Sequence, residues 1–121
     1  MTDGRTTDHS TPDATIDMTT VAVATAATSF AVRVVEGSSL ALSKVRIPPG
    51  GTTGEHRHDC PILVIVESGS LTHHAAVHPA GTRFYRAGEA FLEGADHLHE
   101  GVNDGAEDVV LWMVALGPEV S

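Results

Sequence analysis

Two histidine pairs, and the glycines around them, determine how this sequence is interpreted. The first pair ends the stretch GGTTGEHRH at residues 50–58, and the second is HLH at residues 97–99. Residues i and i+2 of a strand point to the same side, about 7 Å apart along the chain. Two imidazoles placed in this way can converge on one metal ion at about 2.1 Å. One such pair is weak evidence, but two pairs on separate strands favour a metal site.

The sequence around these pairs consists of short apolar stretches bounded by Gly, Pro, Ser, Asn or Asp. Val, Ile, Thr and Leu dominate them, and none shows a 3.6-residue period over three turns. Short strands at this spacing are typical of an all-β sandwich or barrel. We therefore expect six or more strands within residues 29–37, 39–51, 61–70, 71–78, 82–94 and 107–116.

Composition restricts the class of protein. The chain has 121 residues, the size of one domain, and a net charge of −9. This acidity argues against nucleic-acid and anionic-membrane partners, which need a basic patch. The single Cys excludes an intrachain disulfide framework. No apolar run reaches the roughly 18 residues that favour a transmembrane helix.

The amino-terminal part differs in amino-acid composition from the rest of the chain. Residues 1–18 are polar and acidic, so we expect a flexible tail before a single domain at residues 19–121. They lack the basic and apolar regions of a signal peptide, which predicts a cytoplasmic protein. Residues 19–29 could form an edge strand or continue the tail.

The two histidine stretches resemble the two motifs of the cupin superfamily. The first motif, Gly-x5-His-x-His-x3-Glu-x6-Gly, matches at Gly50, His56, His58 and Gly69. The second motif, Gly-x5-Pro-x-Gly-x2-His-x3-Asn, matches at Gly88, His99 and Asn103. The resemblance covers about residues 30–118. It implies a small antiparallel β-barrel of jelly-roll type, the double-stranded β-helix, with a metal ion in its mouth.

The resemblance also implies the metal ligands, and it is incomplete at one of them. His56, His58 and His99 correspond to the family's histidine ligands, whereas Ile62 stands where the family has a glutamate. We therefore expect one divalent ion (Fe, Zn, Ni or Mn) held by three neutral imidazoles, with no carboxylate beside them. Such an ion keeps its full charge and favours an anionic oxygen or sulfur ligand.

Other candidate residues have more than one interpretation. His97 could be a catalytic proton shuttle or a fourth ligand, or it could lie in the turn before the strand. Cys60 could supply a thiolate, but a buried cysteine acting as a small apolar side chain is favoured. His73 and His74 are adjacent, so at most one faces the interior. His78 follows no pattern and is predicted to be exposed.

Several functions remain open at this point. The first is a metal-dependent enzyme acting on a small molecule, either an iron-dependent oxygenase or a Lewis-acid isomerase, lyase or cyclase. The alternative is a cupin that only binds a small ligand or a metal, without catalysis. The resemblance further implies a homodimer, formed by packing of sheets or by exchange of an amino-terminal strand within residues 19–29.

Overall fold

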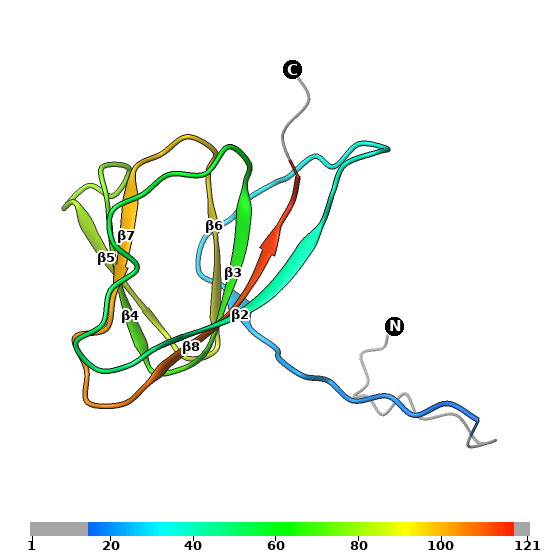
Figure 1. The fold of residues 1–121 in the computed structure, drawn as a ribbon, viewed down its shortest axis with the longest axis horizontal. Coiled ribbons are helices and arrows are strands. Elements are labelled where there is room, and N and C mark those ends of the chain that lie inside the picture. Colours follow the sequence, from blue (N-terminus) through cyan, green and yellow to red (C-terminus); the bar gives the residue numbers. More distant parts are fainter. Residues whose placement is uncertain (1–14, 118–121) are drawn as a thin grey trace.

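The computed structural model describes residues 15–117, and these form eight strands and no helix. Five strands make one sheet in the order β1-β6-β3-β8-β2, and three make a second sheet in the order β5-β4-β7. Figure 1 shows the two sheets facing each other across the interior. The strands are β1 (Thr25–Ala26), β2 (Ala41–Ile47), β3 (Ile62–Ser68), β4 (Ser70–Ala75), β5 (Thr82–Arg86), β6 (Glu89–Glu93), β7 (His99–Val102) and β8 (Val109–Ala115).

The all-β prediction and the jelly-roll expectation are confirmed. Except for the parallel β1–β6 pair, every strand pair is antiparallel. Strand β3 alternates as a two-sided strand should: Ile62, Val64 and Val66 are buried, while Leu63 and Ile65 are half-buried on the outer face. The inward residues of both sheets form one apolar core that includes Leu71, Tyr85, Phe91, Val109 and Leu111.

The pairing of β3 with β6 places two particular residues side by side. Ile62, at the start of β3, lies directly opposite Glu93, at the end of β6. Two residues further along β3, Val64 lies opposite Phe91, and both of these side chains are buried. Because directly opposite residues project to the same face of a sheet, Glu93 points inward together with Ile62.

The amino-terminal segment forms less sheet than predicted. Only Thr25 and Ala26 pair with the edge of β6, so the edge-strand interpretation of residues 19–29 holds for two residues. The strand expected at residues 29–37 is wrong, and Phe30, Val32 and Val34 are exposed. Alternation in the sequence indicates only which side chains could share a face. Here the backbone of residues 29–37 has no neighbouring strand with which to form a ladder of hydrogen bonds.

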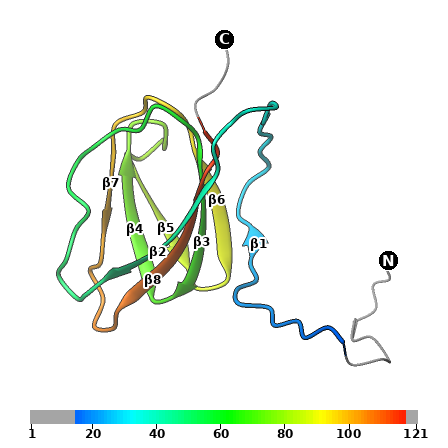
Figure 2. The ribbon, with the colours of Figure 1, turned by 45° about the vertical axis from the view of Figure 1, so that its right-hand side comes forward.

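The expected tail lies partly outside the described residues, which begin at Thr15. Residues 16–20 are exposed, and the segment extends away from the two sheets in Figures 1 and 2. His9, a histidine in this segment that follows no pattern and is predicted to be exposed, also lies outside the described residues. No helix within residues 15–117 is long and apolar enough to cross a membrane.

Candidate metal centre

The first histidine pair lies in the loop between β2 and β3 rather than on a strand. His56 forms an isolated bridge with His99, the first residue of β7. The two residues exchange backbone hydrogen bonds, from each N–H to the other's carbonyl oxygen, both at 2.9 Å. This bridge fixes the loop against β7, and it brings the two halves of the predicted site together.

The three predicted ligands converge. The ring centroids lie 4.7 Å apart for His56 and His58, 4.5 Å for His56 and His99, and 5.0 Å for His58 and His99. One ring nitrogen from each lies within 4.8 Å of those of the other two. An ion at the centre of such a triangle can reach all three nitrogens at ordinary bond lengths after small movements of the rings.

Backbone carbonyls fix the tautomers of two of these histidines. The Nδ1 atom of His56 donates to the carbonyl oxygen of Gly54 at 2.7 Å, and that of His99 donates to His97 at 2.9 Å. A neutral imidazole carries one proton, so Nε2 of each ring keeps a free lone pair. Burial lowers the pKa of His99, although the neighbouring Glu93 carboxylate opposes this shift. The fold therefore gives His99 both a fixed tautomer and a lowered pKa, and both suit a metal ligand.

A carboxylate that the motif spacing does not predict lies beside the three rings. The side chain of Glu93 is only 8% exposed, and its Oε1 atom lies 3.4 Å from His99 Nε2 and 3.7 Å from His58 Nε2. The expectation of a carboxylate-free site is therefore wrong. Glu93 lies directly opposite Ile62, the position of the missing glutamate, so the neighbouring strand supplies the acid.

Three atoms of this cluster have no hydrogen-bond partner among residues 15–117. They are His58 Nε2, His99 Nε2 and Glu93 Oε1, all of them buried. An unpaired buried polar atom costs roughly 1–3 kcal/mol, and more when it carries charge. Three such atoms, close to one another and each able to present a lone pair, fit a bound cation that would satisfy them together. The residues present therefore fit the metal that the motifs imply.

A second layer of histidines lies behind Glu93. His73, on β4, is buried, and its Nε2 atom lies 2.9 Å from Glu93 Oε2. Its Nδ1 atom lies 2.8 Å from Nε2 of His78. The prediction that His78 is exposed is therefore wrong, because this half-buried ring packs against His73. His74 lies on the opposite face of β4 and bonds Thr82, as expected for adjacent strand residues.

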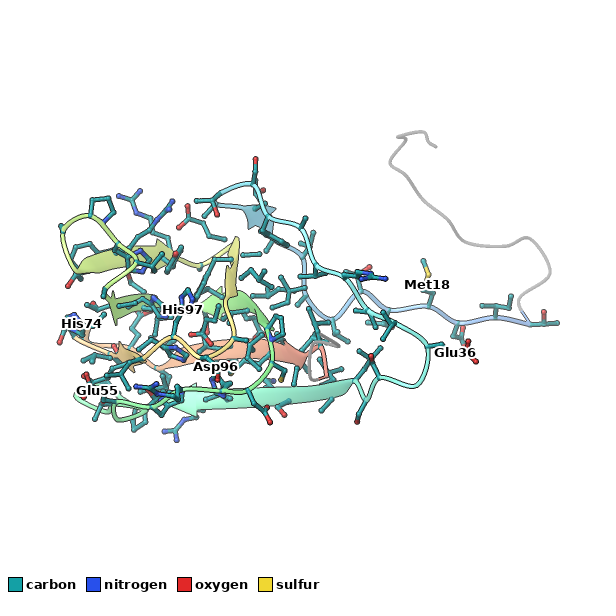
Figure 3. The ribbon with its side chains drawn as sticks, turned by 90° about the horizontal axis from the view of Figure 1, so that it is seen from above. Met18, Glu36, Glu55, His74, Asp96 and His97 are labelled. Atoms are coloured by element: carbon teal, nitrogen blue, oxygen red, sulfur yellow. The ribbon has the colours of Figure 1, made fainter. Side chains whose placement is uncertain are left out.

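The donor cluster consists of His56, His58, His99 and Glu93. His97 and Cys60 lie outside it. His97 is exposed and follows Asp96 in the turn before β7, and Figure 3 labels both residues close together. Its carbonyl orients His99, and its side chain lines a cavity next to the cluster. Cys60 belongs to the apolar core, and burial raises the pKa of its thiol. This is the behaviour of a small apolar side chain rather than of a thiolate ligand.

Two small cavities border the cluster. One of about 30 Å³ is lined by His56, Thr53 and Met113 among others. A second of about 110 Å³ includes His78, Tyr85, Phe91 and His97 in its lining. His73, Glu93 and His99 contribute to both, and no Lys or Arg side chain of the described residues lines either. A ligand in these cavities would meet aromatic rings and imidazoles.

A comparison with known protein families identifies the family to which the chain belongs. Residues 43–115, more than half of the chain, match the cupin domain family. The chain belongs to this family. No curated protein sequence matches the chain significantly.

Solved structures support the fold. A conserved protein of unknown function from Streptococcus pyogenes superposes with a TM-score of 0.59 at 19% identity, covering 71% of each chain. A predicted oxalate decarboxylase from Thermotoga maritima gives 0.56 at 19% identity, covering 63% of this chain and 64% of that one. A recombinant oxalate oxidase in complex with glycolate gives 0.57 at 22% identity, covering 68% of this chain and 44% of that one. The chain thus spans less than two thirds of either oxalate-related protein.

Proposed function

We propose that this cupin is a metal-dependent enzyme for a small molecule, with one divalent ion held by His56, His58, His99 and Glu93. The observation that carries the proposal is the group of three buried, unpaired atoms at His58, His99 and Glu93. Two further features support it. The tautomers of His56 and His99 present Nε2 lone pairs, and the carboxylate of Glu93 supplies the negative charge that the motif lacks at Ile62.

The ligand set restricts the chemistry. Three neutral imidazoles and one carboxylate reduce the charge of a divalent ion by one unit and leave about two positions open in an octahedral geometry. When bound, such an ion supplies a Lewis acid that polarises a carbonyl or hydroxyl oxygen. Imidazole and carboxylate ligands suit Fe, Zn, Ni or Mn.

The neighbouring cavity favours proton transfer on an uncharged substrate. His78, His97 and Tyr85 line it, so titratable groups lie beside the proposed ion. None of the described residues that line it is a Lys or Arg, which argues against a dianionic substrate such as oxalate, despite the oxalate-related structural neighbours. We therefore favour an isomerase, lyase or cyclase acting on a small neutral carbonyl or hydroxyl compound. In this reaction an imidazole nitrogen of His97, at the exposed rim, would exchange a proton with the substrate.

The outer face of the five-stranded sheet supports a further part of the proposal, that the active form is a homodimer. The side chain of Leu42 there is exposed, and Leu63, Ile65 and Val114 are half-buried beside it. Contiguous apolar surface of this kind is usual where two chains pack together.

Metal content tests the proposal. The untagged full-length protein is expected to contain about one equivalent of a first-row divalent metal by inductively coupled plasma mass spectrometry, and His99→Ala is expected to lose most of it. His74→Ala, which changes a histidine on the outer side of β4, is the control and should keep it. Iron would favour the oxygenase alternative, and zinc, nickel or manganese the Lewis-acid enzyme. A protein that holds no metal, even after reconstitution, would contradict the proposal and favour a binding module.

A further inference from the structure

The second layer of histidines suggests a role that the metal ligands themselves do not have. His73 is 4% exposed, and both of its ring nitrogens are hydrogen-bonded, to Glu93 and to His78. His58 and His99, by contrast, each have an unpaired Nε2 atom. Although His73, Glu93 and His99 also lie close enough to hold an ion, binding one at His73 would break its bond to Glu93. The pattern of bonds therefore distinguishes a supporting residue from the ligands.

The direction of each bond follows from the chemistry of the groups. A carboxylate can only accept, so Nε2 of His73 donates to Glu93 Oε2. The Nδ1 atom of a neutral His73 must then accept, and Nε2 of His78 donates to it. Burial, together with the nearby His73 and Arg83, lowers the pKa of His78 and so favours its neutral ring, which donates through Nε2 when that nitrogen carries the proton. The chain of donors thus runs from His78 through His73 to Glu93.

Because of these hydrogen bonds, the two carboxylate oxygens of Glu93 have different surroundings. Oε2 is occupied by His73, whereas Oε1 lies 3.4 Å from His99 Nε2 and has no partner. The ring of His73 is also confined by its neighbours, with centroids 5.1 Å from Phe91 and 5.9 Å from Tyr85. A carboxylate held in this way offers one oxygen in a fixed direction.

We propose that His73, held in place by His78, is a positioning residue that fixes Glu93 as a single-oxygen ligand and thereby strengthens metal binding. This inference rests on the proposed function, since it requires that Glu93 binds the ion. Partners of metal ligands in other proteins typically contribute 10–100-fold to affinity. His73 has the features of such a partner: it is buried, it donates to the ligand, and it is supported by a second residue.

The test is a titration of the metal-free, full-length protein with Co²⁺, whose absorption spectrum reports both affinity and coordination. We expect His73→Leu to weaken Co²⁺ binding about 10–100-fold and to alter the spectrum. His73→Gln, whose side-chain amide can still donate to Glu93, should recover most of the affinity. His74→Leu, one residue along on the outer face of β4, is the matched control and should bind as the wild type does.

A second variant covers the case in which His73→Leu does not fold. His78→Leu removes the support at a half-buried position and leaves His73 in place, and we expect several-fold weaker Co²⁺ binding. Equal affinities for the wild type, His73→Leu and His78→Leu would overturn the role of His73. A His73→Gln variant as weak as His73→Leu would overturn it too, because donation to Glu93 would then not explain the loss. Failure of the wild type itself to bind Co²⁺ would instead contradict the proposed function.

Discussion

Asn103 shows how one side chain can hold several loops in place. It is 1% exposed; its Nδ2 atom donates to the carbonyl oxygens of Ile47 and Glu107, and its Oδ1 atom accepts from the N–H of Gly105. Its backbone also exchanges hydrogen bonds with the Gly50–Gly51 turn. The asparagine at the end of the second motif is therefore a structural residue that ties the end of β2 to the loop after β7.

Asn103→Ala should destabilise the fold and leave the donor cluster unchanged, because the Asn103 side chain makes no hydrogen bond to it. Removal of the amide leaves three backbone groups without a partner in a buried place, so we expect the free energy of unfolding to fall by about 2–4 kcal/mol. Urea denaturation measures this change. The neighbouring Asp104 is exposed, and Asp104→Ala should change stability by no more than about 0.5 kcal/mol. Equal stabilities for the two variants would show that the amide network contributes little.

Some residues of the candidate site could be predicted from the sequence, and others could not. His56, His58 and His99 could be predicted because the spacing of the motifs carries them. The motif does not predict Glu93, because it places its acid at position 62, yet the sequence carries a signal: Glu93 is two residues from the inward-facing Phe91 on the same strand. The contact of His73 with His78 could not be predicted, because it depends on how the turn after β4 folds back.

At the scale of elements, glycines allow the chain to cross between the sheets. Gly69 joins β3 to β4 and has φ +80°, and Gly88 joins β5 to β6 with φ +89°. A Cβ atom at Gly69 would lie 2.5 Å from the carbonyl oxygen of Asp108, whereas one at Gly88 would meet nothing within 4 Å. Gly69 and Gly88 thus have the same backbone conformation but different surroundings.

This difference predicts unequal effects of the same substitution. Gly88→Ala should cost about 1–2 kcal/mol of stability, from the left-handed backbone alone. Gly69→Ala adds a collision with backbone atoms, so we expect a loss of about 3 kcal/mol or more. Thermal and urea unfolding of the two variants compare them directly. A Gly69→Ala protein as stable as Gly88→Ala would mean that the turn relaxes freely.

The strands themselves were mostly predictable. Six apolar stretches were expected, and five of them contain strands β2, β3, β4, β5 with β6, and β8. The sixth, residues 29–37, has the right alternation but no ladder partner. Strand β7 begins at the second histidine of its pair, whereas the first pair lies in a loop. Side-chain periodicity predicts which face is buried, but only tertiary structure decides whether a backbone partner is present.

At the scale of the whole molecule, the apolar outer face of the large sheet predicts a dimer. Light scattering of the full chain should give about twice the 12.6 kDa mass of one chain. Leu42 on this face and Phe84 on the small sheet are each 66% exposed, so Leu42→Glu and Phe84→Glu form a matched pair. The first should yield monomers, and the second should remain dimeric. A wild type that is monomeric at all concentrations would exclude the dimer.

A crystal structure of the metal-loaded protein, with anomalous scattering, tests most directly whether a carboxylate from β6 completes a three-histidine metal site. We expect one ion about 2.0–2.2 Å from Nε2 of His56, His58 and His99 and from Oε1 of Glu93, with His73 still bonded to Oε2. An ion bound by His73, or an ion on the three histidines with Glu93 turned away, would show that Glu93 is not the fourth ligand held by His73.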